Sequence, residues 1–197
     1  MTRLLIVGPQ GSGKGTQGIR IAEAFGIPAI STGDVFRGAV AAGTDLGRQV
    51  KAIIEAGDLV PDELTSAIVR ERLSEPDAEG GFLLDGYPRN LVQVMHLDEF
   101  LEGVDEALDA VIELDVPRDE SIARIARRAA EQGRSDDTEE VIANRLAIYE
   151  RETAPILDIY RTRGVVDRID GVGTLDEITD RIIASLQARG LGRGAAA

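Results

Sequence analysis

A glycine-rich segment near the start of the chain has the residue types needed to hold a phosphate group. Residues 8–16 read Gly-Pro-Gln-Gly-Ser-Gly-Lys-Gly-Thr. Glycines let consecutive backbone N–H groups turn toward one anion, while Lys14 adds a mobile positive charge and the Thr16 hydroxyl can contact phosphate or the Mg²⁺ shell. Gly15 intervenes where the general P-loop pattern has its hydroxyl residue, which indicates a chance match or a subtype that holds the metal differently.

The segments on either side of these glycines favour the phosphate-binding interpretation. Residues 3–7 form a short apolar run that predicts a buried strand. After the loop, Ile19, Ala22 and Phe25 recur at helical spacing. A helix beginning here would point its positive dipole end at the anion. The order of strand, loop, lysine, hydroxyl and helix therefore predicts a P-loop rather than a turn without a ligand.

A second candidate for the site is Asp85, which ends the apolar run of residues 81–85. A carboxylate at the end of a buried strand can reach a hydrated Mg²⁺ that bridges nucleotide phosphates. The signal is weak by itself because Asp often begins the turn after a strand. Together with the P-loop, it favours a role in holding the metal.

Arginines supply further candidates, since a guanidinium holds phosphate in a planar two-pronged contact that lysine cannot make. Five of them stand at predicted loop ends or on one helix face: Arg37, Arg89, Arg128, Arg134 and Arg145. The single histidine, His96, lies inside a predicted helix, and we interpret it as structural or exposed. No catalytic triad or histidine metal site can be assembled around it.

Composition excludes several classes of protein. The 197 residues carry a formal net charge of −13, which argues against a nucleic-acid or acidic-membrane partner. The chain has no cysteine, so disulfides and thiolate metal sites are excluded. The beginning of the chain has no secretory pattern, and we expect a cytoplasmic protein.

Apolar runs and helical stretches alternate along the whole chain. The predicted strands cover residues 3–7, 28–31, 81–85, 110–115 and 165–169. The predicted helices cover residues 16–25, 34–42, 46–56, 62–73, 90–101, 118–130, 138–162 and 175–188, and Pro155 should kink or divide the seventh. This alternation predicts an α/β fold with a parallel sheet covered on both faces. Ligands in such folds bind beyond the carboxyl ends of the strands.

Four segments in order resemble the adenylate kinase family: GPQGSGKGTQ at residues 8–17, ISTGDVFR at 30–37, GDLV at 57–60 and GFLLDGYPR at 81–89. The resemblance covers essentially the whole chain, and Gly15 is itself that family's form of the P-loop. It implies the P-loop nucleoside monophosphate kinase fold, with a five-stranded parallel sheet and a single kinase domain over residues 1–197. A small NMP-binding subdomain at residues 31–60 and a short lid at residues 127–137 are also implied.

The resemblance further implies the reaction ATP + AMP ⇌ 2 ADP by direct in-line transfer, with Mg²⁺ and without zinc. The implied catalytic residues are Lys14, Arg89, Arg128, Arg134 and Arg145. The implied ATP site comprises Gly11, Ser12, Gly13, Lys14, Gly15, Thr16, Arg128 and Gly173. The implied AMP site comprises Thr32, Arg37, Asp58, Leu59, Val60, Gly86, Tyr87, Pro88, Arg89, Gln93, Arg134 and Arg145. Asp85 would hold the metal through its water shell.

Two alternatives stay open at this point. A UMP/CMP kinase shares the fold, but the Gln93 amide can pair with an adenine edge and Thr32 offers a hydroxyl beside the ring. Both positions differ in pyrimidine-specific members, which favours AMP. A P-loop GTPase or a nucleotide-gated interaction module is the alternative from another class, and the chain lacks the Asn-Lys-x-Asp segment that would read guanine. We expect a monomer whose partners are its small-molecule substrates.

Overall fold

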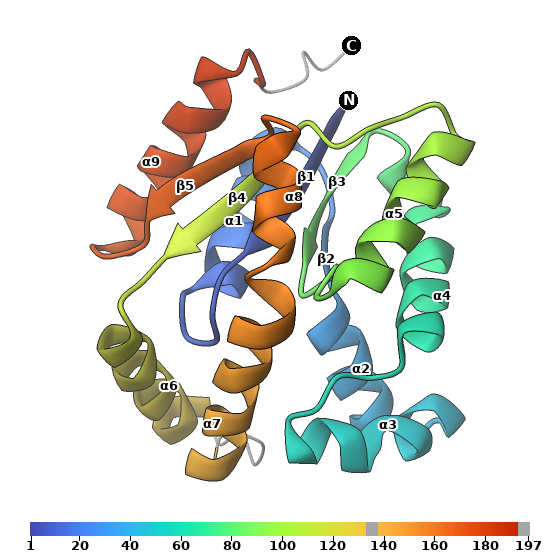
Figure 1. The fold of residues 1–197 in the computed structure, drawn as a ribbon, viewed down its shortest axis with the longest axis vertical. Helices are drawn as coiled ribbons and strands as arrows, with labels where there is room; N and C mark the ends of the chain where they lie inside the picture. The colour runs from blue at the N-terminus through green and yellow to red at the C-terminus, as the bar shows by residue number, and fades with distance from the viewer. Residues whose placement is uncertain (133–137, 193–197) are drawn as a thin grey trace.

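The strands of the protein form one parallel sheet, and they are labelled in Figure 1. A computed structural model describes residues 1–132 and 138–192, with only the backbone at 128–132. Within these residues the sheet has five strands in the order β2-β3-β1-β4-β5. They are β1 (Thr2–Val7), β2 (Ala29–Ser31), β3 (Gly81–Asp85), β4 (Ala110–Asp115) and β5 (Val166–Asp170). This arrangement confirms the predicted fold class.

The central strands are apolar along their whole length because helices cover both of their faces. Every residue of β1 is buried. Successive side chains of a strand point to opposite faces, so Leu4 and Leu5 belong to different cores. β1 pairs with β3 in a register that sets Ile6 beside Asp85. The pairing therefore brings the end of β3 next to the start of the P-loop.

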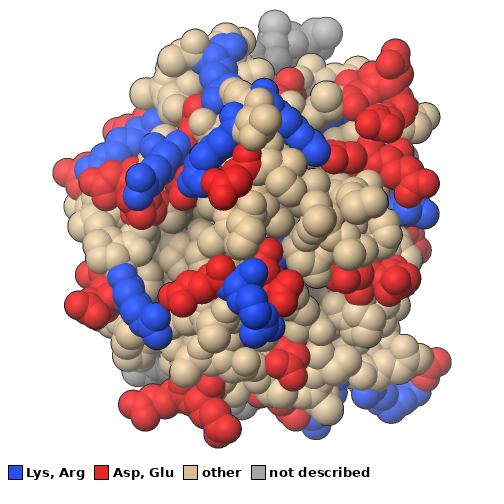
Figure 2. All heavy atoms as spheres, viewed as in Figure 1, with Lys and Arg blue, Asp and Glu red and all other residues tan. Residues whose placement is uncertain are grey.

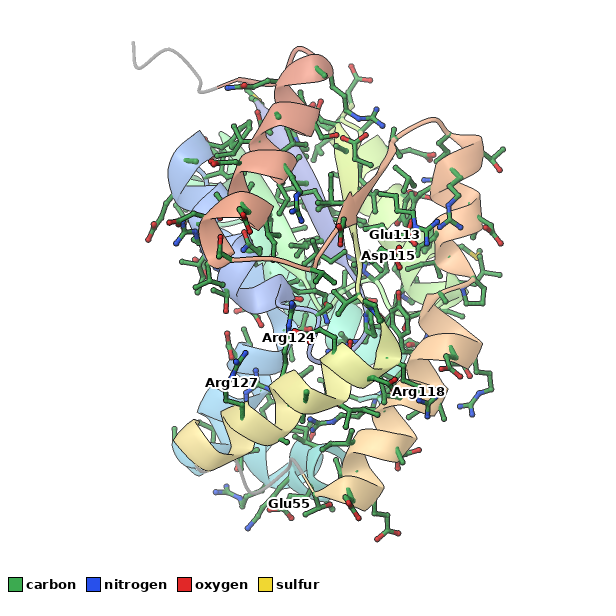
Figure 3. All side chains as sticks on the ribbon, turned by 90° about the vertical axis from the view of Figure 1, so that its left-hand side faces the viewer. Glu55, Glu113, Asp115, Arg118, Arg124 and Arg127 are labelled. Carbon is green, nitrogen blue, oxygen red and sulfur yellow. The ribbon has the colours of Figure 1, made fainter. Side chains whose placement is uncertain are left out.

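Two groups of helices cover the sheet, on opposite sides of it in Figure 3. One group is α1 (Lys14–Phe25) and α9 (Leu175–Ala188), which pack on the face that carries Leu4 and Leu83. The other is α4 (Asp62–Leu73), α5 (Leu91–Gly103) and α8 (Ile156–Thr162), which pack on the face that carries Leu5 and Leu84. No helix among the described residues combines the length and the apolar character needed to span a membrane.

Further helices lie beyond the carboxyl ends of the strands, at the bottom of Figure 1. They are α2 (Thr32–Ala41), α3 (Asp45–Ala56), α6 (Arg118–Gln132) and α7 (Glu139–Ile148). Phe36, Val50 and Val60 form a small apolar core of their own between α2, α3 and the segment that follows. This core lies within residues 31–60, the predicted insertion, so that segment is stabilised partly by its own packing.

The predicted helix over residues 138–162 is divided, as the proline indicated. After α7 the chain makes a π-helical turn at Tyr149–Thr153, in which the Ala154 N–H donates to the Tyr149 carbonyl at 2.8 Å. Pro155 follows this turn and has no N–H to donate, so regular α-helix does not continue through it. α8 begins directly after the proline. A short 3₁₀ helix at Pro76–Ala78, before β3, is an element that the sequence patterns did not predict.

Candidate active site

The glycine-rich segment forms a tight loop between β1 and α1. The Ser12 N–H donates to the Pro9 carbonyl at 3.1 Å, and Lys14 Nζ donates to the same oxygen at 2.9 Å. Gly11 has a φ of 82°, and a Cβ there would overlap the Ser121 carbonyl oxygen of α6. Glycine is required at this position both for its left-handed backbone and for the close approach of α6. The loop is therefore shaped by a contact with a helix more than a hundred residues away.

Asp85 stands at the end of β3 and faces the start of α1. A Cβ placed on Gly15 would lie 3.6 Å from Asp85 Oδ2, which locates the carboxylate beside the first turn of that helix. Burial raises the pKa of Asp85, while the positive charges of Lys14 and Arg89 act in the opposite direction. A carboxylate in this setting gains from any cation that enters the site.

Arg89 shows the opposite electrostatic effect. Burial lowers the pKa of the Arg89 guanidinium, Asp85 opposes that shift, and repulsion by Arg145 and Arg37 adds to it. Arg37, which pairs with Asp34 at 2.6 Å, and Arg145 therefore both act on Arg89. The charges of Lys14, Arg37 and Arg89 all act on Asp85. Such a group of cations favours a bound polyanion, because the anion would relieve their mutual repulsion.

The loop that carries Arg89 is held rigidly. Arg89 Nε donates to the Gly86 carbonyl at 2.7 Å, and Thr32 Oγ1 donates to the same oxygen at 2.9 Å. The Arg89 carbonyl accepts from Thr153 Oγ1 at 2.8 Å. A Cβ on Gly86, whose φ is 82°, would lie 2.8 Å from Thr32 Oγ1. Two predicted AMP residues, Thr32 and Arg89, are thus joined through one backbone carbonyl.

The predicted base-reading residue Gln93 lies just beyond this loop in α5. Its side chain is almost completely buried, with 2% of the residue exposed. Oε1 accepts from the Arg89 backbone N–H and Nε2 donates to Asp62 Oδ1, both at 2.8 Å. The structure therefore places Gln93 beside the predicted phosphate-binding arginine and binds both ends of its amide to protein groups.

Asn144 and Arg145 of α7 contact the end of α3 and the residue Asp58 beyond it. Asn144 Nδ2 donates to Asp58 Oδ1 at 2.8 Å and to the Ala56 carbonyl at 3.0 Å. The guanidinium of Arg145 donates to the Ile54 carbonyl at 3.2 Å. Helix α7 is thereby attached to the predicted NMP-binding subdomain.

The other predicted nucleotide-binding residues are Gly173, Arg128 and Arg134, of which only Gly173 is fully described. Gly173 follows β5 with a φ of 141°, in a conformation that favours glycine. At Arg128 the description covers the backbone of α6, and Arg134 lies outside the described residues. Their proposed contacts with nucleotide stay predictions.

Arg124 is a site residue that the sequence patterns did not single out. It extends from α6 toward the carboxyl ends of the strands in Figure 3. Its guanidinium donates to the Gly171 carbonyl at 3.0 Å and to the Ser12 carbonyl at 3.4 Å, and pairs with Glu120 at 2.7 Å. It thus joins the P-loop to the loop after β5. Its sequence signal is only an acidic residue four positions earlier, a common surface pattern.

His96 is half-buried and lies in a hydrogen-bonded row. Its Nδ1 is 2.9 Å from Ser66 Oγ, which is 2.8 Å from the Tyr87 hydroxyl. The interpretation of His96 as structural fits this geometry. The row nevertheless connects it to the loop of residues 86–89, although no sequence pattern placed the two together.

Together these features define a P-loop nucleotide-binding protein with the architecture of a nucleoside monophosphate kinase. A phosphate loop and a second cationic loop flank one buried carboxylate at the carboxyl edge of a 2-3-1-4-5 sheet. That edge is where ligands bind in open α/β sheets.

Comparison with known proteins identifies the family. The model of the family described as "Adenylate kinase" matches residues 6–165. The adenylate kinase of Clavibacter michiganensis subsp. michiganensis is 56% identical over 191 residues, which are 97% of this chain and 96% of that protein. The adenylate kinase of Leifsonia xyli subsp. xyli is 55% identical over 95% of this chain and 94% of its own length. That of Stenotrophomonas maltophilia is 50% identical over 94% of this chain and 100% of its own length. The chain belongs to the adenylate kinase family.

Proposed function

We propose that Lys14 and the arginines around Asp85 align and neutralise the phosphates of ATP and AMP for direct phosphoryl transfer. The chain is an adenylate kinase, an enzyme that interconverts ATP + AMP and two ADP. The observation that supports the proposed site is that the charges of Lys14, Arg37 and Arg89 act on one buried carboxylate, Asp85, while those of Arg37 and Arg145 act on Arg89. Two nucleotides bring many negative charges together, and such a group of cations is what their mutual approach requires.

On this proposal ATP occupies the P-loop side of the cleft. The residues that would hold it are Gly11, Ser12, Gly13, Lys14, Gly15, Thr16, Arg128 and Gly173. AMP would occupy the other side, with its phosphate on Arg37 and Arg89 and its base between residues 58–60 and Gln93. Thr32 and residues 86–88 would line this pocket. Arg134 and Arg145 would contact the phosphates of both nucleotides.

The chemistry needs no general base. A phosphate oxygen of AMP, ionised at neutral pH, forms the new bond to the γ-phosphorus of ATP. The bond to the β–γ bridging oxygen breaks, and its electron pair stays on ADP. The protein's task is then to align the two oxygens in line, to neutralise charge and to exclude water. We propose that residues 31–60 and a short lid at 127–137 enclose the substrates, and residues 133–137 of that lid lie outside the described residues.

The residues beside the P-loop suit a hydrated Mg²⁺. No cluster of three or more His, Cys, Asp or Glu side chains within the described parts of the chain is placed to hold a metal by itself. Mg²⁺ bound with a nucleotide needs only one or two protein oxygens, because phosphates and water fill its other positions. Asp85 would supply such an oxygen, through water, and the exposed Thr16 directly follows Gly15 in the first turn of α1. When bound, the ion would neutralise charge on the β- and γ-phosphates.

The test is a turnover assay with purified protein, Mg²⁺ and ATP, alone and with AMP, CMP, UMP or GMP. We expect rapid ADP formation with AMP and negligible turnover with ATP alone. Lys14→Met should lower kcat/KM by about 100-fold or more, because one cation is lost against developing charge in a water-poor site. Lys51→Met is the matched control, since Lys51 is the other lysine of the chain and is exposed. A folded Lys14→Met protein with near wild-type turnover would refute the P-loop assignment.

A further inference from the structure

The Gln93 amide lies between a hydrogen-bond acceptor, the Asp62 carboxylate, and a hydrogen-bond donor, the Arg89 backbone N–H. Asp62 begins α4, and its Oδ1 accepts from Gln93 Nε2 and from Asn90 Nδ2, each at 2.8 Å. On the other side of the amide, Gln93 Oε1 accepts from the Arg89 N–H at 2.8 Å. These partners come from α4, the loop after β3 and α5, so the arrangement depends on the tertiary structure.

The chemistry of the partners leaves the amide only one favourable orientation. An ionised carboxylate can only accept hydrogen bonds, and a backbone N–H can only donate. A reversed amide would turn its oxygen toward Asp62 and its NH₂ group toward the Arg89 N–H, which gives two repulsive contacts.

A fixed amide can distinguish bases by the order of their donors and acceptors. After its two protein contacts, Gln93 retains one N–H and one oxygen lone pair. Adenine presents its N6 amino donor beside the N1 acceptor, which complements this amide. Hypoxanthine has the same ring size but presents the O6 acceptor beside an N1–H donor, which is the inverted order. A phosphate anchored on Arg37 and Arg89 prevents the base from turning over to compensate.

We propose that Asp62 is a specificity-determining positioning residue, which orients the Gln93 amide for adenine and against bases with the inverted order. The inference rests on the proposed contact between Gln93 and the base of AMP. Glu63, the next residue, is also acidic and in the first turn of α4, but it is exposed. It therefore provides a control for any general effect of charge at this helix start.

The experiment measures kcat/KM for AMP and for inosine monophosphate (IMP) at saturating Mg²⁺ and ATP. Asp62→Ala should lower the AMP/IMP ratio by about tenfold, since a hydrogen bond to a charged group is lost and the amide is freer to reverse. Asp62→Asn should keep most of the ratio, because its amide oxygen can accept the same bond. Glu63→Ala should keep the wild-type ratio, and the KM for ATP should be unchanged in all three.

Two controls separate an orienting role from a merely structural one. Asn90→Ser removes the other bond to Asp62 while a serine can still cap α5. If Asn90→Ser lowers the AMP/IMP ratio as much as Asp62→Ala does, the proposal is overturned. The Asp62 carboxylate would then act by holding the start of α5 in place and not by orienting the Gln93 amide. Equal losses toward AMP and IMP in Asp62→Ala, with the ratio unchanged, would overturn it as well.

Failure of this proposal can be distinguished from failure of the proposed site. Gln93→Ala with a wild-type AMP/IMP ratio would show that Gln93 does not read the base, which refutes both. A lowered ratio in Gln93→Ala together with an unchanged ratio in Asp62→Ala would refute only the role of Asp62. If Asp62→Ala does not fold, Asp62→Glu keeps the charge but displaces the oxygen. Asp62→Glu should also lower the AMP/IMP ratio, and a wild-type ratio in this variant would contradict the proposal.

Discussion

The Arg89 guanidinium is hydrogen-bonded to the same loop that carries the residue. Its Nε already donates to the Gly86 carbonyl at 2.7 Å, so the terminal nitrogens are aimed by the loop itself. A lysine at this position would have a single point charge on a flexible stem and could not copy the planar contact.

We therefore predict that Arg89→Lys is nearly as harmful as Arg89→Ala for kcat/KM with AMP. Steady-state kinetics with varied AMP at fixed ATP would measure the effect. Arg48→Lys, on an exposed arginine of α3, is the control and should have little effect. An Arg89→Lys enzyme with wild-type AMP kinetics would show that charge alone is sufficient.

Asp85 combines its proposed role at the metal with a cost in stability. Because burial raises its pKa in the folded protein, the folded state keeps the Asp85 proton to a higher pH than the unfolded state does. The stability associated with that proton is fully present below the unfolded pKa of about 4. It is lost as the pH rises through the folded pKa.

Asp85→Asn should therefore unfold at higher urea concentration than the wild type at pH 7, in chelator and without nucleotide. The difference should shrink as the pH falls toward about 4, where the wild-type carboxyl is also neutral. The same variant should lose activity with Mg²⁺ and ATP, because the carboxylate that would hold the metal's water shell is gone. A variant that is less stable than the wild type at pH 7 would contradict the sign of this argument.

At the scale of elements, the site depends on how helices beyond the sheet edge contact the loops. α6 touches the P-loop through Ser121 and Arg124, and α7 is joined to α3 through Asn144 and Arg145. The two proposed nucleotide sites thus each have one helix from the second half of the chain attached to them.

Gly11→Ala tests the contact between the P-loop and α6. The new Cβ would overlap the Ser121 carbonyl and lie 2.8 Å from Ile125 Cγ1, at a φ of 82°. Left-handed backbone alone costs about 1–3 kcal/mol for a residue with a side chain, so we expect a lower Tm and a higher KM for ATP. Gly38→Ala, in α2 with nothing within 4 Å of its Cβ, should instead stabilise by about 0.5–1 kcal/mol. Equal Tm values for the two variants would refute the packing argument.

At the scale of the whole molecule, positive charge is distributed unevenly. On the face shown in Figure 2 basic and acidic side chains are interspersed. Arginines far from the site pair with acids, as in Arg163–Asp98 at 2.6 Å and Arg189–Asp167 at 2.8 Å. A protein with a net charge of −13 can still bind polyanions where cations gather. The charges of Lys14, Arg37 and Arg89 all act on the buried Asp85 carboxylate, although Arg37 also pairs with Asp34 at 2.6 Å. This is where we place the phosphates.

Metal dependence is the prediction for the molecule as a whole. The chain has no cysteine and one histidine, so purified protein should contain no stoichiometric zinc by elemental analysis. Activity should nevertheless require added Mg²⁺. Stoichiometric zinc, or full turnover in excess chelator, would contradict the proposed donor set.

Local sequence patterns were sufficient to predict most of the elements and the glycine-rich loop before α1. β3, β4, α4 and α9 have the predicted bounds because their apolar patterns end at turn residues and helix caps. The sequence also identified the family, since four motifs occur in order. Such elements and turns can be predicted from the sequence, because strand and helix periodicities and glycine requirements act within a few residues.

Only the tertiary structure decided how distant residues meet. α1 begins at Lys14, two residues earlier than predicted, since Gly13 takes a left-handed conformation as the N-cap. The contacts of Arg124 with Ser12 and Gly171, and of Asp62 with Gln93, join residues that are 31 to 112 positions apart. No local pattern encodes such pairs, because they depend on the order of the strands and on which helix faces pack together. The orientation of the Gln93 amide depends on this tertiary packing.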